Sequence, residues 1–335
     1  SCMPTQEYIE LPEVEDKDLP DILSMEIIET NNKDEAKIKL YVNNPGSETI
    51  TNIEIKNLEC HIESQTYSDG KSEVIADISN PIRYTSEYEI ISITTKGVIN
   101  NEYTREYKNG ERKLYVDFYK EINNISDWEE IIKSPTENYI LNQDLDFMNQ
   151  GQNIIITNTF SGKLNGNNHV IRNIRVPDNY KAVFYNLSGS ISNLTIENYS
   201  QNIINGNNTF GFISNGNSTS IIDNVHINNA NIYKEDSTEV VFGTILGQGS
   251  YTTIRNSRIN ISKYIESATI GGILGKNLSS NIENSFVQNL DIDVTNALTL
   301  KGIGGIVGVT NAGTVINCYS TGTINANKEY VGGIV

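Results

Sequence analysis

Along most of the chain, apolar and polar residues alternate in short runs rich in Ile, Val and Thr, and these runs recur at a regular interval. Each run carries an aliphatic residue, any residue and then Asn. The copies are Ile171–Asn173, Ile191–Asn193, Ile222–Asn224, Ile254–Asn256, Ile282–Asn284 and Val315–Asn317, and their Asn residues are 20, 31, 32, 28 and 33 positions apart. This spacing indicates a repeated structural unit rather than a chance motif.

A second landmark, a glycine beside aliphatic residues, shares that period. Its copies are Gly211, Gly243, Gly272, Gly305 and Gly333, at spacings of 32, 29, 33 and 28. Short β-branched runs with a period of about 30 residues, without paired amphipathic helices, predict a parallel β-solenoid in which each repeat forms one coil. We expect the glycines to fill tight corners or positions with φ > 0, and the Asn residues to stack as amide ladders at bends.

Period-two alternation also predicts which residues face the core. The aliphatic residue of each copy points inward, so its neighbour points outward. We place the parity reset at the Asn bend, after which Ile174, Leu194 and Val225 point inward. On the outward side, Asp223, Arg255 and Glu283 are expected to form a ladder of alternating charge when successive coils stack in register.

The segment "ISDWEEIIKSP" predicts a short helix over 127–133 ahead of the repeats. Ser126 and Glu129 have the spacing of a capping box, and Pro135 stops the helix. Its apolar stripe includes Trp128, the only Trp in the chain. We expect this helix to cover the open first coil, with Trp128 as the plug; the alternative is a carbohydrate-stacking Trp.

Residues 21–121 follow a different pattern. Alternating runs turn at Asn44-Pro45-Gly46, Asp69-Gly70 and Asn109-Gly110, which are short-range hairpin signals. About seven strands in roughly 100 residues predict an immunoglobulin-like β-sandwich. Residues 1–20, acidic and bearing proline, are expected to be a linker. The solenoid with its cap then occupies 122–335, and we expect it to continue beyond the fragment.

Composition narrows the possible partners. The 335 residues carry a formal charge of −17, and residues 1–150 hold 31 acidic against 14 basic side chains, whereas residues 151–335 hold 11 of each. This gives no basic footprint for nucleic acid. No apolar run reaches the roughly 18 residues of a membrane span, so we expect no membrane insertion. Asn, with 46 copies, suits an AT-rich bacterial source. We expect a monomer.

Few residues offer chemistry. Asp144 and Asp146 lie two apart and face one side of a strand, so they are candidates for a Ca²⁺ site or an acid–base pair, or else a structural signature. Cys60-His61 is the only Cys/His neighbour pair, and three cysteines are too few for a disulfide framework or a zinc site. The role of Cys2 stays open between a native residue, a lipid-attachment site and a cloning remnant.

The remaining histidines and the tyrosines are interpreted as structural or surface residues. His226 is expected at an outward position beside Thr195 and Arg258, as a surface residue, and His169 in the turn of the first coil. Ten of the 18 Tyr fall in residues 1–150, which favours the first half as a contact surface. We predict no catalytic residue, no cofactor and no metal site in this chain.

Two stretches carry a family resemblance. "GGIVGVTNAGTVINCYSTGTI" and "GGILGKNLSSNIENSFV" resemble GLUG-motif repeats of bacterial surface proteins. "DWEEIIKSPTENYILNQDLDF" with "FSGKLNGNNHVIRNI" resembles the N-terminal region of the secreted zinc metallopeptidases of the immunoglobulin A1 protease type from Gram-positive bacteria. The resemblance, which includes "LPDILSMEIIET" and "NPIRYTSEYEIISITTKG", covers roughly residues 20–335.

The resemblance implies a function for a larger protein. That family cuts with zinc held by H-E-x-x-H, and none of His61, His169 and His226 fits the motif, so zinc is expected only in a catalytic domain outside this chain. The chain is then expected to be a non-catalytic binding or spacer module, secreted or attached to the cell wall, that recognises a host glycoprotein such as immunoglobulin A. The alternatives are a free-standing adhesin or stalk, and a carbohydrate-active β-helix enzyme.

Overall fold

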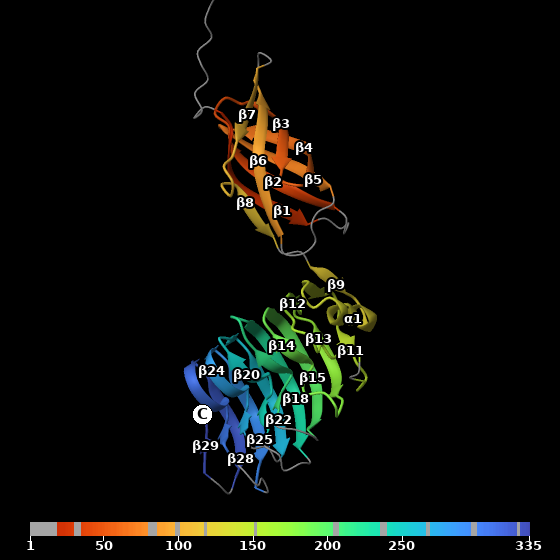
Figure 1. Cartoon of the computed structure of the whole chain (residues 1–335), viewed down its shortest axis with the longest axis vertical. Coiled ribbons are helices and arrows are strands. Elements are labelled where there is room, and N and C mark those ends of the chain that lie inside the picture. The colour runs from red at the N-terminus through yellow and green to blue at the C-terminus, as the bar shows by residue number, and fades with distance from the viewer. Residues whose placement is uncertain are drawn as a thin grey trace, which may run out of the picture. The chain divides into compact units, whose positions relative to one another are not determined.

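The computed structural model describes residues 19–29, 35–79, 86–97, 101–116, 119–150, 153–203, 208–234, 240–265, 269–295, 300–326 and 329–335. The chain divides into two units, Ser1–Phe118 and Tyr119–Val335, which we treat separately. The expected linker lies outside the described residues except for its last two positions, and so does Cys2. The all-β fold class is confirmed, with antiparallel sheets in the first unit and a parallel solenoid behind one short helix in the second (Figure 1).

The first unit packs two antiparallel sheets around a core that includes Ile38, Leu40, Val74 and Tyr88. One sheet has the order β1-β2-β5-β4, and in the other β6 pairs with β3, β7 and β8. The strands are β1 (Asp21–Glu29), β2 (Glu35–Asn43), β3 (Thr49–Ile55), β4 (Glu59–Ser68), β5 (Lys71–Ser79), β6 (Ser86–Lys96), β7 (Glu102–Glu106) and β8 (Lys113–Val116). This arrangement fits the predicted immunoglobulin-like sandwich.

Only one of the three expected hairpins forms. Asp69 and Gly70, both with positive φ, join β4 to β5 as a hairpin. The turn at Pro45 instead carries the chain from β2 in one sheet to β3 in the other, and the turn at Gly110 joins β7 and β8, which both pair with β6 rather than with each other. The two hairpin predictions were wrong because a turn dipeptide fixes the local reversal but not the pairing partner.

The second unit is a solenoid whose named strand pairs are all parallel. The flank that begins each coil is built from β14 (Phe184–Leu187), β17 (Ile213–Gly216), β20 (Leu246–Ser250), β24 (Leu274–Glu283) and β27 (Val307–Ile316). The other strands of this sheet are β9 (Lys120–Ile122), β10 (Tyr139–Leu141), β11 (Leu145–Asp146), β12 (Lys163–Asn165), β13 (Val170–Val176), β15 (Ser190–Ile203), β18 (Ile221–Lys234), β21 (Thr253–Arg255), β22 (Arg258–Ile265), β25 (Phe286–Asp293) and β28 (Tyr319–Asn325). A separate sheet stacks β16 (Thr209–Phe210), β19 (Val241–Gly243), β23 (Thr269–Gly271), β26 (Gly302–Gly304) and β29 (Val331–Gly332).

The inward columns agree with the alternation. Ile191, Ile222, Ile254 and Ile282 are fully buried and lie in register. The predicted parity reset is also present, because the residues directly after the first five Asn bends are buried, namely Ile174, Leu194, Val225, Ser257 and Ser285. A continuous apolar core therefore runs along the solenoid axis, and each coil depends on its neighbours to bury it.

Asn, not Gly, occupies the left-handed corners. Every Asn of the repeated motif has φ between 50° and 57°. The five repeated glycines have no φ in that region. Gly211, Gly243, Gly272 and Gly305 are needed because a side chain would collide with the next coil, whereas a Cβ on Gly333 would meet nothing within 4 Å. A Cβ on Gly243 would stand 2.5 Å from the amide nitrogen of Gly275 in the next coil and 2.0 Å from the carbonyl oxygen of Leu246 in its own coil, and one on Gly272 would stand 2.0 Å from the carbonyl oxygen of Gly305. The prediction that glycine supplies φ > 0 was therefore wrong, although the need for small residues was real.

The first motif copy belongs to a different column. Ile171 pairs with Ile196, so Asn173 stacks under Asn198 and not under Asn193. Asn193 instead donates its amide to Asn165. Each coil thus has two left-handed corners five residues apart. The spacing of 20 between Asn173 and Asn193 was therefore measured between two different corners.

Helix α1 (Ile125–Lys133) covers the first coil but begins two residues earlier than predicted. Its N-cap is Asn124, whose side chain accepts from the amide of Asp127, while the Asp127 carboxylate accepts from the amide of Asn123. This earlier reciprocal cap replaces the expected Ser126–Glu129 box. Trp128 is fully buried against Phe147 and donates its indole N–H to the Ile154 carbonyl at 3.0 Å, so it plugs the end and cannot stack on a carbohydrate.

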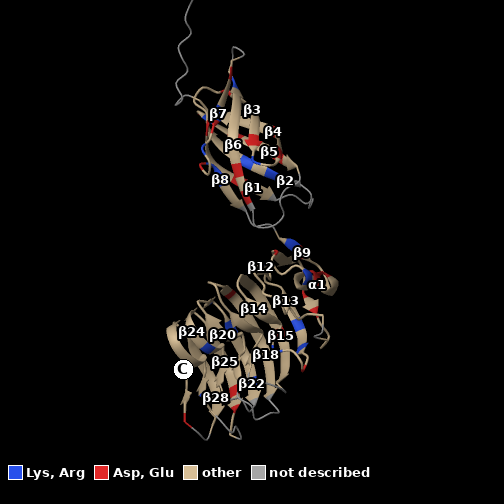
Figure 2. Ribbon diagram, viewed as in Figure 1, with Lys and Arg blue, Asp and Glu red and all other residues tan. Residues whose placement is uncertain are grey.

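Charged side chains follow the division into units. They are frequent on the first unit and sparse on the coils of the second (Figure 2). No helix in the described part of the chain has the length and apolar character that crossing a membrane requires.

Candidate functional site

The Asp144 and Asp146 carboxylates are held by backbone and side-chain donors of the next coil. Asp144 accepts from the Val170 amide at 2.9 Å and contacts His169 Nδ1 at 3.1 Å. The Val170 amide, followed by His169, lowers the pKa of Asp144. Asp146 accepts from the Asn173 side chain at 2.9 Å, which lowers its pKa too. Asp146 starts the amide ladder that continues through Asn173, Asn198 and Asn229.

His226 is a neutral, half-buried member of the corner ladder. Its Nε2 lies 2.6 Å from Asn224 Oδ1, an acceptor, so Nε2 carries the proton. Burial, followed by the charge of Arg258 in the next coil, lowers the pKa of His226 to about 4. Thr195 and Arg258 are its register neighbours, as predicted. A histidine held neutral beside an arginine is a poor proton carrier near neutral pH.

The Cys60–His61 pair does not converge. Both lie on β4, where successive side chains point to opposite faces, and His61 is exposed while Cys60 is partly buried. Burial raises the pKa of the Cys60 thiol to about 11. Within the described ranges, no group of three or more His, Cys, Asp or Glu residues gathers as metal ligands do.

Amide ladders run along both corners. Asn224 donates to Asn193, and Asn317 donates to Asn284, at 3.0 and 3.2 Å. On the second corner, Asn229 donates to Asn198 at 2.9 Å. The predicted charge ladder forms in register, and Arg255 donates to Asp223 at 3.0 Å. These contacts use the side chains for stacking the coils and satisfying the bends.

An open groove lies on the flank of the second unit, between the β17-β20-β24-β27 strands and the separate sheet. We call it the flank groove. It holds a cavity of about 730 Å³, and a smaller cavity of about 380 Å³ beside residues 178–185 adjoins it at Asn208; we count both as the flank groove. The larger is lined by residues that include Thr209, Val241, Gln248, Thr269, Lys276 and Tyr330. The smaller is lined by Asp178, Asn179, Tyr180, Lys181, Tyr185 and Phe210, with Asn208.

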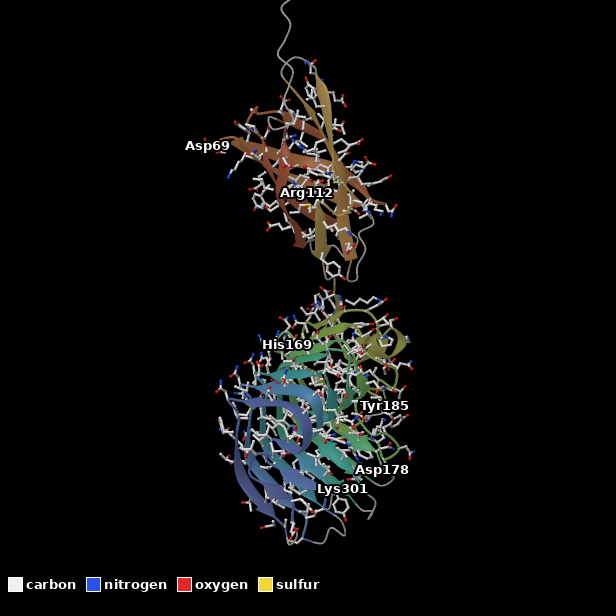
Figure 3. The ribbon with its side chains drawn as sticks, turned by 60° about the vertical axis from the view of Figure 1, so that its left-hand side comes forward. Asp69, Arg112, His169, Asp178, Tyr185 and Lys301 are labelled. Carbon is white, nitrogen blue, oxygen red and sulfur yellow. The ribbon has the colours of Figure 1, made fainter. Side chains whose placement is uncertain are left out.

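Two register columns form the walls of this groove. Thr209, Val241 and Thr269 follow one another in adjacent coils on the separate sheet. On the facing flank, Asn215, Gln248 and Lys276 likewise follow one another in adjacent coils. Figure 3 places Tyr185, Asp178 and Lys301 along one side of the solenoid. Because the columns are parallel, the groove crosses several coils and suits an elongated ligand.

The polar groups of the groove differ from those of the corners. The Tyr180 and Tyr185 rings meet edge to face at 6.5 Å, and the Lys181 ammonium lies 5.1 Å from the Tyr185 ring centre. Burial raises the pKa of the Tyr185 hydroxyl. Tyr330 is 69% exposed. Amides, phenols and ammonium groups hydrogen-bond and stack, so the arrangement can hold a polar ligand.

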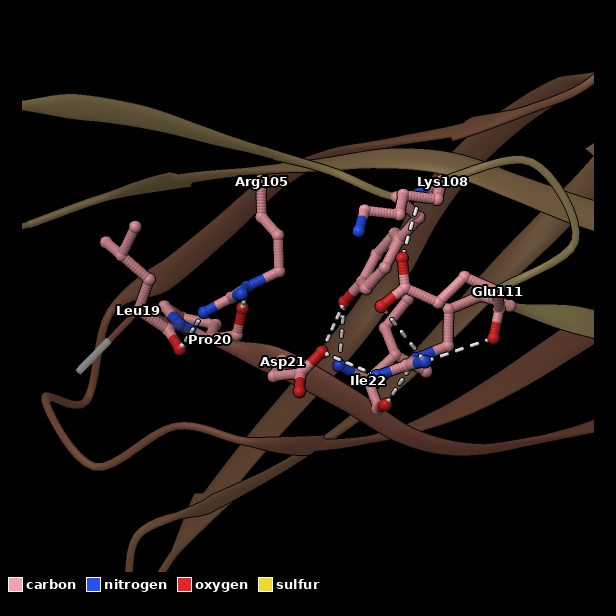
Figure 4. Close-up of polar contacts among 9 residues, drawn as sticks. Leu19, Pro20, Asp21, Ile22, Arg105, Lys108 and Glu111 are labelled. Atoms are coloured by element: carbon pink, nitrogen blue, oxygen red, sulfur yellow. Dashed lines mark hydrogen bonds and ion pairs between the residues drawn. The ribbon is translucent and has the colours of Figure 1, made fainter. Parts of the chain in front are cut away.

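The first unit has a polar cluster of a different kind, drawn in Figure 4. The Tyr107 hydroxyl donates to Asp21 and accepts from the Ile22 amide, both at 2.9 Å. Arg112 lies over the Tyr107 ring and donates to Asp21 at 3.0 Å and to the Ile22 carbonyl at 2.8 Å. Arg105 donates to the Pro20 carbonyl. Because these bonds tie β1 to the segment around β7 and β8, we interpret the cluster as a structural clasp.

Sequence reasoning did not find the flank groove. Its lining residues stand about one coil apart, and no motif connects them. Exposed tyrosines also occur in both units, with Tyr67 and Tyr115 in the first and Tyr251 and Tyr330 in the second. The count of tyrosines alone therefore did not locate a surface.

Comparison with known proteins adds one motif. The family model of the GLUG motif matches residues 300–325. No curated protein matches the chain. A solved structure titled "IgA1 Protease" is similar, with a TM-score of 0.38 and 16% identity over 87% of this chain and 26% of that one. The chain thus spans about a quarter of that structure's length, and a likeness of this size supports no functional argument.

Proposed function

We propose that this chain is a non-catalytic binding and spacer module of a secreted or cell-surface bacterial protein. The observation that carries the proposal is the flank groove, which presents amide, phenol and ammonium groups on a stack of coils. Asp144 and Asp146, the candidates for a Ca²⁺ site or an acid–base pair, bond to the next coil instead, and His226 bonds to Asn224 of its own coil.

The scaffold supports both parts of this role. Each coil adds a rise of about 4.8 Å and is fixed to its neighbours by a buried core and amide ladders. Such a stack holds a binding surface at a set distance from whatever follows it. The side chains on the groove walls keep their relative positions because they stand on paired strands.

The sequence resemblance suggests the parent protein. We propose that it is a zinc metallopeptidase that acts on a host glycoprotein, with immunoglobulin A1 as the first partner to test. A docking surface separate from the catalytic domain raises the effective concentration of substrate near the zinc. Zinc would belong to that other domain.

The test is binding of the whole 335-residue chain to purified human immunoglobulin A1 by biolayer interferometry. An unrelated serum glycoprotein serves as the control. Saturable binding to immunoglobulin A1 alone is the expected result. Equal responses on both proteins, or no response at tens of micromolar, would remove this partner and leave a spacer or stalk.

A further inference from the structure

We infer that the flank groove binds an extended acidic oligosaccharide, one that carries carboxylate or sulfate groups. This inference rests on the proposed function, because it takes the chain to be a binding module. It adds the chemical class of the ligand and the residues that hold it.

The charge of the groove differs from that of the chain. Lys181, Lys276 and Lys301 line the two cavities, against one carboxylate, Asp178. Residues 151–335, which include every residue of the groove, hold 11 acidic and 11 basic side chains, so the acidic excess of the chain lies outside this stretch. A groove with net positive lining on a neutral stretch of coils attracts an anion locally, which favours a ligand that lies along the groove.

The neutral groups of the groove suit sugar rings. Asn208 and Gln248 present planar amides, each with donor and acceptor atoms for hydroxyl groups. Tyr180 and Tyr185 stand at one end and Tyr330 at the other, with ring faces that pack against the C–H faces of sugars. Amide, phenol and ammonium groups together match an acidic glycan better than a fully apolar ligand.

The length of the groove also fits a chain of sugars. Thr209, Val241, Thr269 and Gly302 occupy one register column, and Tyr330, whose carbonyl accepts from the Ile303 amide, extends it by one coil to four coil steps. At about 4.8 Å per step, this column spans roughly 19 Å. A single sugar would fill only part of it, so we expect affinity to rise with oligosaccharide length.

An extended acidic peptide is the competing ligand, and the strand pairing disfavours it. Extended peptides gain affinity by adding a strand to an open sheet edge. Beside the groove, β19 already pairs with β16 and β23, and β20 already pairs with β17 and β24. Their backbone groups are used by the coils, so the ligand must be recognised by side chains.

The experiment measures binding of labelled oligosaccharides to the whole chain by fluorescence polarisation. The acidic probes are a sialylated N-acetyllactosamine chain, a hyaluronan octasaccharide and a heparin octasaccharide. The neutral probes are the desialylated chain and maltooctaose, and an oligoglutamate peptide is the competitor. We expect saturable binding of at least one acidic probe, weakened when salt is raised, and little binding of neutral probes.

Two variants and two matched controls locate the site. Lys276→Gln and Tyr330→Ala are expected to weaken binding by about tenfold or more each. The controls are Tyr251→Ala, which is 68% exposed and has a left-handed φ like Tyr330, and Lys263→Gln, an exposed lysine on β22. Both controls are expected to bind as the unchanged chain does. Urea unfolding of all four establishes that they are folded.

The outcomes separate this inference from the proposed function. Acidic probes that fail to bind, oligoglutamate that binds more tightly than every sugar, or binding that survives both groove variants would overturn the inference. If the chain binds immunoglobulin A1 and enzymatic removal of its sialic acid leaves that binding unchanged, while no acidic probe binds, docking stands and the groove assignment fails. If an acidic probe binds and immunoglobulin A1 does not, the groove assignment stands and the partner is wrong.

Discussion

Ile261 interrupts the second amide ladder and tests the account of the corners. It lies in register between Asn229 and Asn289, both at positive φ, and itself has φ 61°. A β-branched residue in this conformation is strained because its Cβ approaches the following carbonyl. Ile261→Asn should therefore relieve strain and restore the missing rung to Asn229.

The magnitude follows from three contributions. Relief of the left-handed strain returns roughly 1 to 2 kcal/mol. A new amide bond to Asn229 adds about 0.5 to 1.5 kcal/mol. Ile261 is 50% exposed, so loss of its buried half costs about 1 kcal/mol. We expect a net gain of about 1 kcal/mol, which with an m value of roughly 3 kcal/mol/M moves the urea midpoint up by about 0.3 M.

The assay is urea unfolding followed by Trp128 fluorescence, which reports on the second unit alone because the chain has one Trp. Far-UV circular dichroism on the same samples checks that the coils unfold together. Ile261→Val keeps the strain and should give no gain, while Ile261→Gly relieves it without adding a rung. A lowered midpoint in Ile261→Asn, or an equal rise in Ile261→Val, would refute the corner account.

Three further predictions concern packing, the clasp and pH. Gly243→Ala should cost about 3 kcal/mol in the same urea assay because its Cβ meets backbone atoms, and Gly333→Ala should be neutral because nothing lies within 4 Å of its Cβ; equal effects would contradict close packing as the cause. Tyr107→Phe removes the hydroxyl that bridges the β1 amide and carboxylate, so we expect a loss of about 1 to 3 kcal/mol by circular dichroism melting, and an unchanged melt would show the clasp to be dispensable. His226 should titrate near pH 4 by NMR. Because its pKa of about 4 lies below the unfolded value of roughly 6.5, the unfolded chain gains the proton first, so stability should fall as the pH drops from 6.5 to 4, and His226→Gln should lessen that fall.

The sequence predicted the inward columns because one face of every strand is buried. Where burial is one-sided, a residue shift would turn the whole apolar set outward, so alternation alone fixes the facing of Ile222 and Ile254. The register of the first coil was out of reach for a different reason. Ile191–Asn193 and Ile196–Asn198 carry the same motif at two successive corners, and the motif cannot say which corner Ile171–Asn173 matches.

The glycine error and the missed groove have a shared origin. Small size at Gly243 and Gly272 answers a contact between coils, and the groove walls likewise come from residues one coil apart. Neither the contact between coils nor the neighbourhood of the groove residues can be seen along a single strand. Predicting them requires knowing which residues of successive coils lie beside each other. The helix cap was nearly predictable, because Asn124 and Asp127 have the same spacing as the pair that was chosen instead.

The columns differ in how freely they can change, and this bears on function. At the corners, Asn224 and Asn229 each bond to the coil before, so a change there is felt by two coils. On the groove wall, the register column changes from amide to ammonium to isopropyl at Gln248, Lys276 and Val309 while the core behind it stays aliphatic. Substitutions at such positions usually alter stability little. The side chains of the flank are therefore free to change one coil at a time without altering the fold, which is the property that a recognition surface on a repeat scaffold needs.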